Sequence, residues 1–324
     1  MIRNIAERNP ALARDALLGL RAYENAQRRA QPASAPEVSR VRGSCLRDHG
    51  GKGPVAILIP SLINPPRILD LDEQVSLAGA VARMGRQALL LDWGRAADRH
   101  GLDIAGHVEE LLLPLLRSIG EPCAIVGYCL GGTMAVAAAN LHQCERIVTL
   151  AAPWHFALYP SSSRAALHEM WRHSEAASRE LGALPMEVLQ ASFWSLDPER
   201  TVLKFAEFAK LDQHVLEARR FVELEDWANE GEPLPYPAAK ELIEDMFERD
   251  APGNGQWRVG GRLMDEELSV PLLNLTANRD RIAPASTAPA GAKIGIDAGH
   301  VGMIVGSARS ILHGALRHFL EGGR

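Results

Sequence analysis

The sequence contains few of the features that mark export, disulfide bonding or membrane insertion. Its 324 residues include only four cysteines and no CxxC pair, a usage typical of reduced, cytoplasmic proteins. No apolar run approaches the length of a membrane-spanning helix, and the first residues are amphipathic and unlike a signal peptide. We therefore expect a cytoplasmic protein with no transmembrane segment.

The sequence also lacks a strong excess of charge and any pattern of metal ligands. Lysine and arginine number 35 against 40 aspartates and glutamates, which gives a net charge of -5 and a pI near 6.1. Such a balance does not indicate a nucleic-acid partner. Neither HxxxH nor HExxH occurs, so no metal site is predicted. No cofactor is predicted either.

Short apolar runs alternate with segments of helical spacing in two parts of the chain. Strands alternating with helices indicate a mostly parallel, doubly wound α/β sheet. The length suffices for one such domain with an insertion. Strands are predicted at residues 55–59, 88–91, 123–126, 147–150, 271–275 and 292–296, and helices at 73–84, 106–119, 130–141 and 307–321.

The alternation is interrupted by a long helical block. Residues 154–250 are helical in character and carry four tryptophans, so they can pack a small core of their own. A helical block between sheet strands is typical of a cap that covers a functional site. We predict a core of residues 39–153 and 251–324, with residues 154–250 as its cap.

Residues 1–38 are predicted to form an N-terminal helix and a linker. Residues 2–30 are rich in alanine and leucine, and the stretch 31–37 is proline-rich. Two interpretations of the amphipathic helix stay open. It packs against a domain, or it binds a lipid surface.

The run Gly127-Tyr128-Cys129-Leu130-Gly131 has the form G-x-nucleophile-x-G between a predicted strand and a predicted helix. That is the context of a nucleophile elbow. Glycines at 127, 131 and 132 allow the strand and helix to approach closely, and the helix N-terminus favours a thiolate. Cys129 is therefore predicted to be a nucleophile. Cys123 and Cys144 lack this setting and are expected to be structural.

An acid and a base are expected after the nucleophile in chain order. Asp280 follows the predicted strand that ends near Ala277, and His300 follows the last predicted strand between two glycines. His300 would accept the proton of Cys129, and Asp280 would orient the imidazole. The alternatives that stay open are His155 as the base and Asp92 or Asp297 as the acid.

An oxyanion hole is expected beside the elbow. One donor would be the backbone N–H of Leu130, which directly follows the nucleophile. The other would come from the segment after the first strand, from the backbone of Ser61 or Leu62.

These motifs together resemble the polyhydroxyalkanoate synthases, a family with an α/β-hydrolase fold. The elbow and its continuation, residues 127–133, are similar to that family's cysteine box. Further similarity lies in Ile63-Asn64 with residues 68–71, in residues 255–261, in 271–280 with 282–284, and in the histidine loop at 298–302. The resemblance covers roughly residues 54–150 and 246–305.

The resemblance implies a Cys-His-Asp triad that acts on (R)-3-hydroxyacyl-CoA thioesters, with CoA as the leaving group and a polyester chain as the acceptor. The resemblance also leaves three kinds of association open: with a granule surface, as a homodimer, or with a partner subunit. The sequence decides none of them. Two other functions stay open. The chain could be a hydrolase of esters or thioesters with the same cysteine, or a non-catalytic protein that binds granule or lipid surfaces.

Overall fold

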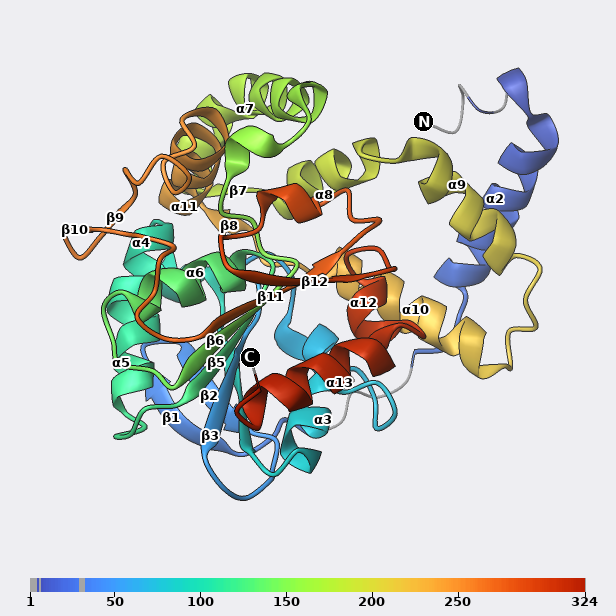
Figure 1. Ribbon diagram of the computed structural model, residues 1–324. Coiled ribbons are helices and arrows are strands. Elements are labelled where there is room, and N and C mark those ends of the chain that lie inside the picture. The colour runs from blue at the N-terminus through green and yellow to red at the C-terminus, as the bar shows by residue number, and fades with distance from the viewer. Residues whose placement is uncertain (1–4, 6, 29–32, 324) are drawn as a thin grey trace. The chain divides into compact units, whose positions relative to one another are not determined.

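The protein is described by a computed structural model that covers residues 5, 7–28 and 33–323 (Figure 1). The chain divides into two compact units. Unit 1 comprises Met1–Ala33 and Glu187–Gly231, and unit 2 comprises Ser34–Met186 and Glu232–Arg324. The units divide the predicted cap, residues 154–250, because residues 187–231 belong to unit 1 and the remainder belongs to unit 2. The domain limits given by the sequence analysis stay a prediction.

Unit 2 is built on a mostly parallel eight-stranded sheet, which confirms the predicted fold class. The parallel strands are mostly apolar runs that are buried apart from partly exposed end residues in β4, β6 and β11. Strand β12 differs, because its first four residues are exposed. In sheet order the strands are β1 (Glu37–Val41), β2 (Ser44–Asp48), β4 (Gln87–Asp92), β3 (Val55–Ile59), β5 (Ala124–Tyr128), β6 (Arg146–Leu150), β11 (Leu272–Ala277) and β12 (Ala292–Ile296).

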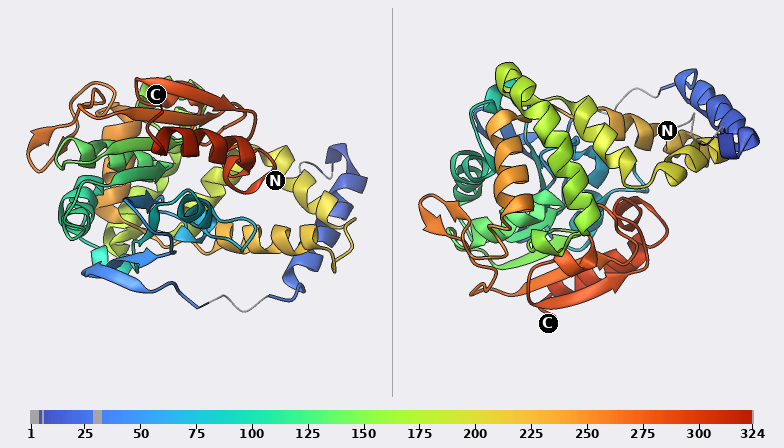
Figure 2. Two further views of the ribbon diagram at one scale, coloured as in Figure 1. Left: turned by 60° about the horizontal axis from the view of Figure 1, so that its bottom comes forward. Right: turned by 90° about the horizontal axis from the view of Figure 1, so that it is seen from above.

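The hairpin β1–β2 was not predicted. It forms one edge of the sheet, and β12 forms the other (Figure 2). Strand β1 pairs antiparallel with β2, and β2 pairs antiparallel with β4, so this edge departs from the parallel order. β1 is largely exposed and polar, which suits a strand with a free edge.

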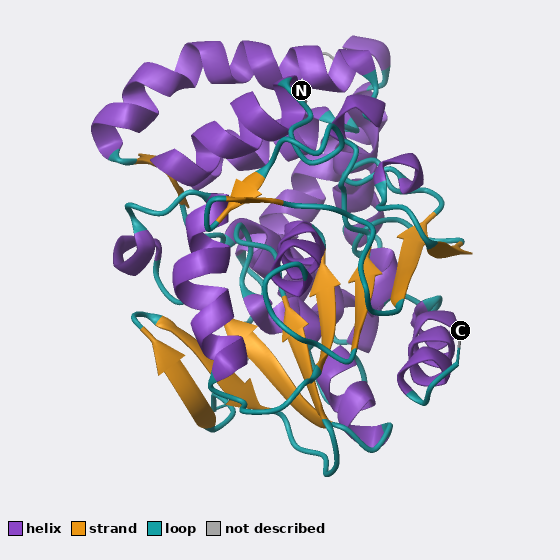
Figure 3. Cartoon of the chain, turned by 60° about the vertical axis from the view of Figure 1, so that its left-hand side comes forward, coloured by secondary structure: helices purple, strands orange, loops and turns teal. Residues whose placement is uncertain are grey.

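Helices cover both faces of the sheet (Figures 1 and 3). Helices α5 and α6 lie on one face, and α3 and α13 lie on the other. The core helical elements are η1 (Pro66–Leu69), α3 (Leu77–Arg83), η2 (Ala96–Arg99), α4 (Ile104–Gly106), the π-helical η3 (His107–Leu112), α5 (Leu113–Arg117), α6 (Leu130–Ala139), η6 (Ala285–Thr287), α12 (Gly302–Val305) and α13 (Arg309–Leu320).

The part of the predicted cap that belongs to unit 2 contains a long helix. In it, Trp171 is buried, donates its indole N–H to Glu244 at 3.1 Å and stacks on Tyr236. The elements of this part are η4 (Phe156–Leu158), α7 (Ser161–Leu181), α11 (Tyr236–Lys240), the π-helical η5 (Glu241–Glu248), and the short pair β7 (Ala183–Leu184) with β8 (Leu234–Pro235). A second short pair, β9 (Arg258–Val259) with β10 (Arg262–Leu263), follows the predicted cap.

Unit 1 is a helical body formed by segments far apart in the sequence. The helix predicted over 2–30 is observed as α2 (Pro10–Glu24), and residues 1–4, 6 and 29–32 lie outside the described residues. α2 packs on α9 (Pro198–Phe208), and α9 is followed by α10 (Leu216–Asn229). Helix α8 (Met186–Ser195) begins at the unit boundary. Among the described residues, no helix is both long and apolar enough to cross a membrane.

Candidate active site

The turn between β5 and α6 has the geometry of a nucleophile elbow. Cys129 adopts φ 55° and ψ -131°, a conformation that is strained for a residue other than glycine. The surrounding backbone holds it there. The N–H of Cys129 donates to the carbonyl of Leu150 at 2.9 Å, and its carbonyl accepts from Gly132 at 2.8 Å. The thiol is partly exposed, whereas the other three cysteines are buried.

The elbow glycines are required because the backbone passes too close for a side chain. A Cβ atom on Gly127 would lie 2.4 Å from the Cα of Gly132. One on Gly132 would lie 2.4 Å from the Cβ of Ala152, and one on Gly131 would lie 2.3 Å from the carbonyl of Ile59. The third contact brings the start of α6 against the segment that follows β3.

His300 and Asp280, the predicted base and acid, form a buried pair. The Nδ1 atom of His300 lies 2.6 Å from Oδ2 of Asp280. The other carboxylate oxygen of Asp280 accepts from the N–H groups of Ile282 and Ala283 at 2.7 and 2.9 Å. The acid is therefore anchored to its own loop, and the bond to Nδ1 leaves the Nε2 atom of His300 for Cys129.

The charges around His300 favour its protonated form. Burial by itself lowers the pKa of this imidazole. The negative charges of Cys129 and Asp280, together with hydrogen bonds to both, outweigh burial and raise the pKa to about 10. An imidazolium beside a thiolate is the pairing that activates a cysteine nucleophile.

The predicted oxyanion residues meet at the same edge of the sheet. Leu130 is the first residue of α6, where helix N–H groups have no partner within the helix. The next residue, Gly131, approaches the carbonyls of Ile59 and Pro60, so the start of α6 lies beside the segment that contains Ser61 and Leu62, both of which are buried. Which of the two supplies the second donor stays a prediction.

The alternative site residues are engaged elsewhere. His155 contacts Glu266 through Nε2 at 3.0 Å. Asp92 pairs with Arg47 at 3.2 Å, and Asp297 is largely exposed and pairs with Arg279 at 3.0 Å. The structure thus brings Cys129, Asp280 and His300 together and leaves the three alternatives to other contacts.

Two tyrosines at the site were not singled out from the sequence. The ring of Tyr128 lies 5.0 Å from that of His300, and its hydroxyl donates to the His300 carbonyl at 3.4 Å. Tyr159 is buried, and its pKa is raised by burial and then by the charges of Cys129 and Asp280. Tyr128 lies inside the elbow motif and could have been noticed there. Tyr159 lies in the insertion, where no motif marks it.

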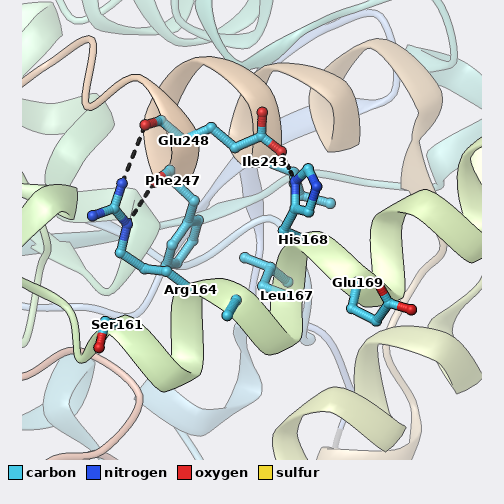
Figure 4. Close-up of a pocket in the computed structure, with 9 residues that line it drawn as sticks. Ser161, Arg164, Leu167, His168, Glu169, Ile243, Phe247 and Glu248 are labelled. Carbon is cyan, nitrogen blue, oxygen red and sulfur yellow. Dashed lines mark hydrogen bonds and ion pairs between the residues drawn. The ribbon is translucent and has the colours of Figure 1, made fainter.

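A cavity outside the triad is lined by none of Cys129, Asp280 and His300. It has a volume of about 590 Å³ and is lined from α7 and η5 (Figure 4). Arg164 donates to the carbonyls of Phe247 and Glu248, and His168 contacts the Glu248 carboxylate at 2.5 Å.

Within the described part of the chain, no group of three or more histidine, cysteine and acidic side chains is arranged to hold a metal ion.

Comparison with known sequences identifies relatives of the chain. It is 26% identical over 275 residues to the poly(3-hydroxyalkanoate) polymerase subunit PhaC of Haloarcula marismortui, which covers 78% of this chain and 57% of that protein. It is 26% identical over 295 residues to the subunit of the same name from Synechocystis, which covers 83% and 78%. The resemblance to the polyhydroxyalkanoate synthases is confirmed. The chain thus spans little more than half of the Haloarcula relative, and no family model matches it.

Comparison with solved structures identifies the fold. The epoxide hydrolase of Bacillus megaterium superimposes with a TM-score of 0.58 at 13% sequence identity, over 88% of this chain and all of that one (100%). The fold of unit 2 is therefore the α/β-hydrolase fold. The elbow, Asp280 after β11 and His300 after β12 follow one another in the chain order of nucleophile, acid and histidine that is typical of this fold.

Proposed function

We propose that the protein is an acyltransferase that accepts (R)-3-hydroxyacyl groups from CoA thioesters on Cys129 and passes them to a hydroxyl of a polyester chain. The observation that carries the proposal is the buried pair of His300 and Asp280 behind a strained cysteine elbow. The relatives, which are named poly(3-hydroxyalkanoate) polymerases, support the choice of substrate. CoA leaves as a product, and no cofactor is required.

In the first step the Cys129 sulfur attacks the thioester carbonyl. The oxyanion that forms is stabilised by the N–H of Leu130 and by a donor from Ser61 or Leu62. The intermediate then collapses, the bond to the CoA sulfur breaks, and His300 gives its proton to the leaving thiolate. A cysteine suits this exchange because the new thioester is close in energy to the old one.

In the second step His300 acts as a base. The acyl-enzyme no longer carries the negative charge of a thiolate, so one of the influences that raise the pKa of His300 is gone. The neutral imidazole takes the proton of the acceptor hydroxyl as the oxygen attacks the acyl group. The Cys129 thiolate leaves, and its charge again favours the imidazolium. Acylation itself thus converts His300 from acid to base.

The nature of the acceptor is tested by following products from (R)-3-hydroxybutyryl-CoA. The proposal predicts release of free CoA together with insoluble polymer. Release of CoA with free 3-hydroxybutyrate would instead make the protein a thioester hydrolase. If no CoA is released, the CoA thioester is not its substrate.

The roles of the triad are tested with Cys129→Ala and His300→Ala. Each is expected to abolish CoA release, because neither the nucleophile nor the base has a substitute among the contacts at the site, while thermal unfolding shows a folded protein. Stoichiometric alkylation of Cys129 near neutral pH, slowed by substrate, would exclude a non-catalytic surface-binding role. Turnover that persists in either variant would refute the triad. Granule association and a partner subunit remain predictions.

A further inference from the structure

A buried polar cluster lies outside the triad. It consists of Trp93, Arg99 and His107, whose exposed fractions are 4%, 3% and 0%. Trp93 directly follows β4, Arg99 ends η2, and His107 begins η3. The acyl-transfer steps proposed above use none of the three. Burying a guanidinium costs free energy of solvation, and packing alone seldom accounts for it. The hydrogen bonds of the cluster indicate its role.

Two members of the cluster bind the segment that follows β3. The indole Nε1 of Trp93 donates to the carbonyl of Pro60 at 3.1 Å, and Nη2 of Arg99 donates to the carbonyl of Leu62 at 3.4 Å. A trans peptide directs its C=O and N–H to opposite sides. Holding these two carbonyls therefore fixes the peptide planes on either side of the Ser61–Leu62 peptide. The direction of the Ser61 N–H is set with the Pro60 carbonyl, and the Ser61–Leu62 peptide, which carries the Leu62 N–H, is constrained from both sides.

His107 holds Arg99 in place as a neutral acceptor. Its Nδ1 lies 2.6 Å from the carbonyl of Asp103 and must donate to it, so Nε2 is free to accept from Nη1 of Arg99 at 3.2 Å. Burial lowers the pKa of His107 to about 3, which keeps this ring neutral at physiological pH. Trp93 packs edge-on against the same ring, with the ring centroids 5.9 Å apart. The three side chains thus form one connected network of hydrogen bonds and ring contacts that binds the segment after β3.

The charge of Arg99 is retained in spite of burial. Burial lowers its pKa to about 10, and the charges of Glu232 and Asp92 counteract that effect. The Glu232 carboxylate is itself fixed, because it accepts from the N–H of Ala96 at the start of η2 at 2.9 Å. The guanidinium is therefore protonated at neutral pH, and a charged donor makes the stronger hydrogen bond to a carbonyl.

We propose that Arg99, with Trp93 and His107, is a positioning residue that holds the 60–62 segment in the geometry needed to stabilise the oxyanion. The inference rests on the proposed function, since it assigns the cluster to the acyl-transfer step. Arg99 acts through the Leu62 carbonyl and does not touch the substrate. Its effect is confined to reactions that pass through a tetrahedral oxyanion.

The test compares two reactions of the same sulfur in the full-length protein. Acylation by (R)-3-hydroxybutyryl-CoA forms an oxyanion, and alkylation of Cys129 by iodoacetamide does not. Arg99→Lys keeps a positive charge but loses the planar fork, and Trp93→Phe keeps the ring but loses the N–H. Arg86→Lys is the matched control, because Arg86 is also buried but binds Glu145 and the carbonyl of Leu320.

Arg99→Lys and Trp93→Phe are each expected to slow acylation roughly tenfold, less than the 10²–10³ that the loss of a whole oxyanion donor costs. KM and the alkylation rate should stay within about twofold of the wild type, as should every rate of Arg86→Lys. The inference is overturned if alkylation falls as much as acylation, or if acylation is unchanged in both variants.

A second acyl donor separates this inference from the proposed function. The same variants are assayed with p-nitrophenyl butyrate, whose reaction also passes through an oxyanion. If the wild type releases p-nitrophenol but no CoA, the proposed substrate is wrong. The positioning role is then judged from p-nitrophenol release, with the same expected loss and the same overturning results.

Discussion

At the scale of single residues, the site depends on how firmly each member is held. Asp280 is anchored by two backbone N–H groups, so the carboxylate cannot turn away from His300. Cys129 is held in its strained conformation by hydrogen bonds on both sides of the residue. The imidazole of His300 is hydrogen-bonded to both Cys129 and Asp280, and its protonation therefore reports on both.

Replacing Cys129 by alanine is expected to lower the pKa of His300, because it removes one of the two charges that raise it. NMR titration of the His300 ring measures this directly. Cys123→Ala is the matched control, since Cys123 is a buried cysteine just before β5 and should leave the titration unchanged. An unaltered His300 titration in Cys129→Ala would contradict a thiolate–imidazolium pair.

The same interaction has a consequence for stability. The pKa of His300 is raised in the folded protein from an ordinary value of 6.5 to about 10. Its contribution to stability is therefore complete below about pH 6.5 and is lost as the pH rises towards about 10. In Cys129→Ala, where the pKa of His300 is lower, denaturant unfolding at a series of pH values should show that the His300 contribution is lost over a narrower window, which ends at a lower pH.

At the scale of elements, the elbow depends on close packing between α6 and its neighbours. Gly131→Ala would place a methyl group 2.3 Å from the backbone oxygen of Ile59, which cannot move without displacing β3. We expect a loss of stability of about 1–3 kcal/mol and a loss of acyl transfer, because α6 must shift away from the 60–62 segment. Denaturant unfolding and CoA release measure the two effects.

Gly314→Ala supplies the control for that substitution. Gly314 lies within α13, and a Cβ atom there would meet nothing within 4 Å. Alanine in a helix interior is favoured over glycine by roughly 0.5–1 kcal/mol, so this variant should be as stable as the wild type or more so. If Gly131→Ala behaves like Gly314→Ala, the close approach at the elbow is not required.

The sequence was informative where a local pattern carries the structure. The buried parallel strands are continuous apolar runs, and the elbow combines two glycines with a strand and a helix, so both were predicted. The hairpin β1–β2 was missed because its first strand, Glu37–Val41, is polar and largely exposed. The cluster at Arg99 was also missed. Trp93 and Arg99 bind Pro60 and Leu62, which lie more than thirty residues earlier in the chain, and no local pattern reveals such contacts.

At the scale of the whole molecule, the N-terminal helix belongs with part of the insertion. A Cβ atom on Gly19 of α2 would lie 1.8 Å from the carbonyl of Phe205 in α9, so the two helices are in close backbone contact. Tyr23 donates to Asp226 of α10 at 2.6 Å, and Arg28 binds the same carboxylate at 3.1 Å. The helices formed by residues 198–229 are thus stabilised by contacts with a segment that lies almost two hundred residues away in the sequence.

An acidic side chain placed in this helix contact should therefore unfold unit 1 selectively. Ala16 is buried in the cluster with Val202 and Ala206, and Ala16→Asp would bury a carboxylate with no partner there. We expect the free energy of local opening of residues 198–229 to fall by roughly 2–3 kcal/mol. Hydrogen exchange measured by mass spectrometry would detect this as a loss of protection in α9 and α10.

Ala11→Asp is the matched control, because Ala11 is exposed in the first turn of the same helix, where an acidic residue is tolerated or favoured. It should leave protection unchanged. Strand β5 in unit 2 should keep its protection in both variants, because unit 2 has its own core. If Ala16→Asp leaves α9 protected, or if β5 loses protection together with α9, then α2 and residues 187–231 do not form an independent cooperative unit.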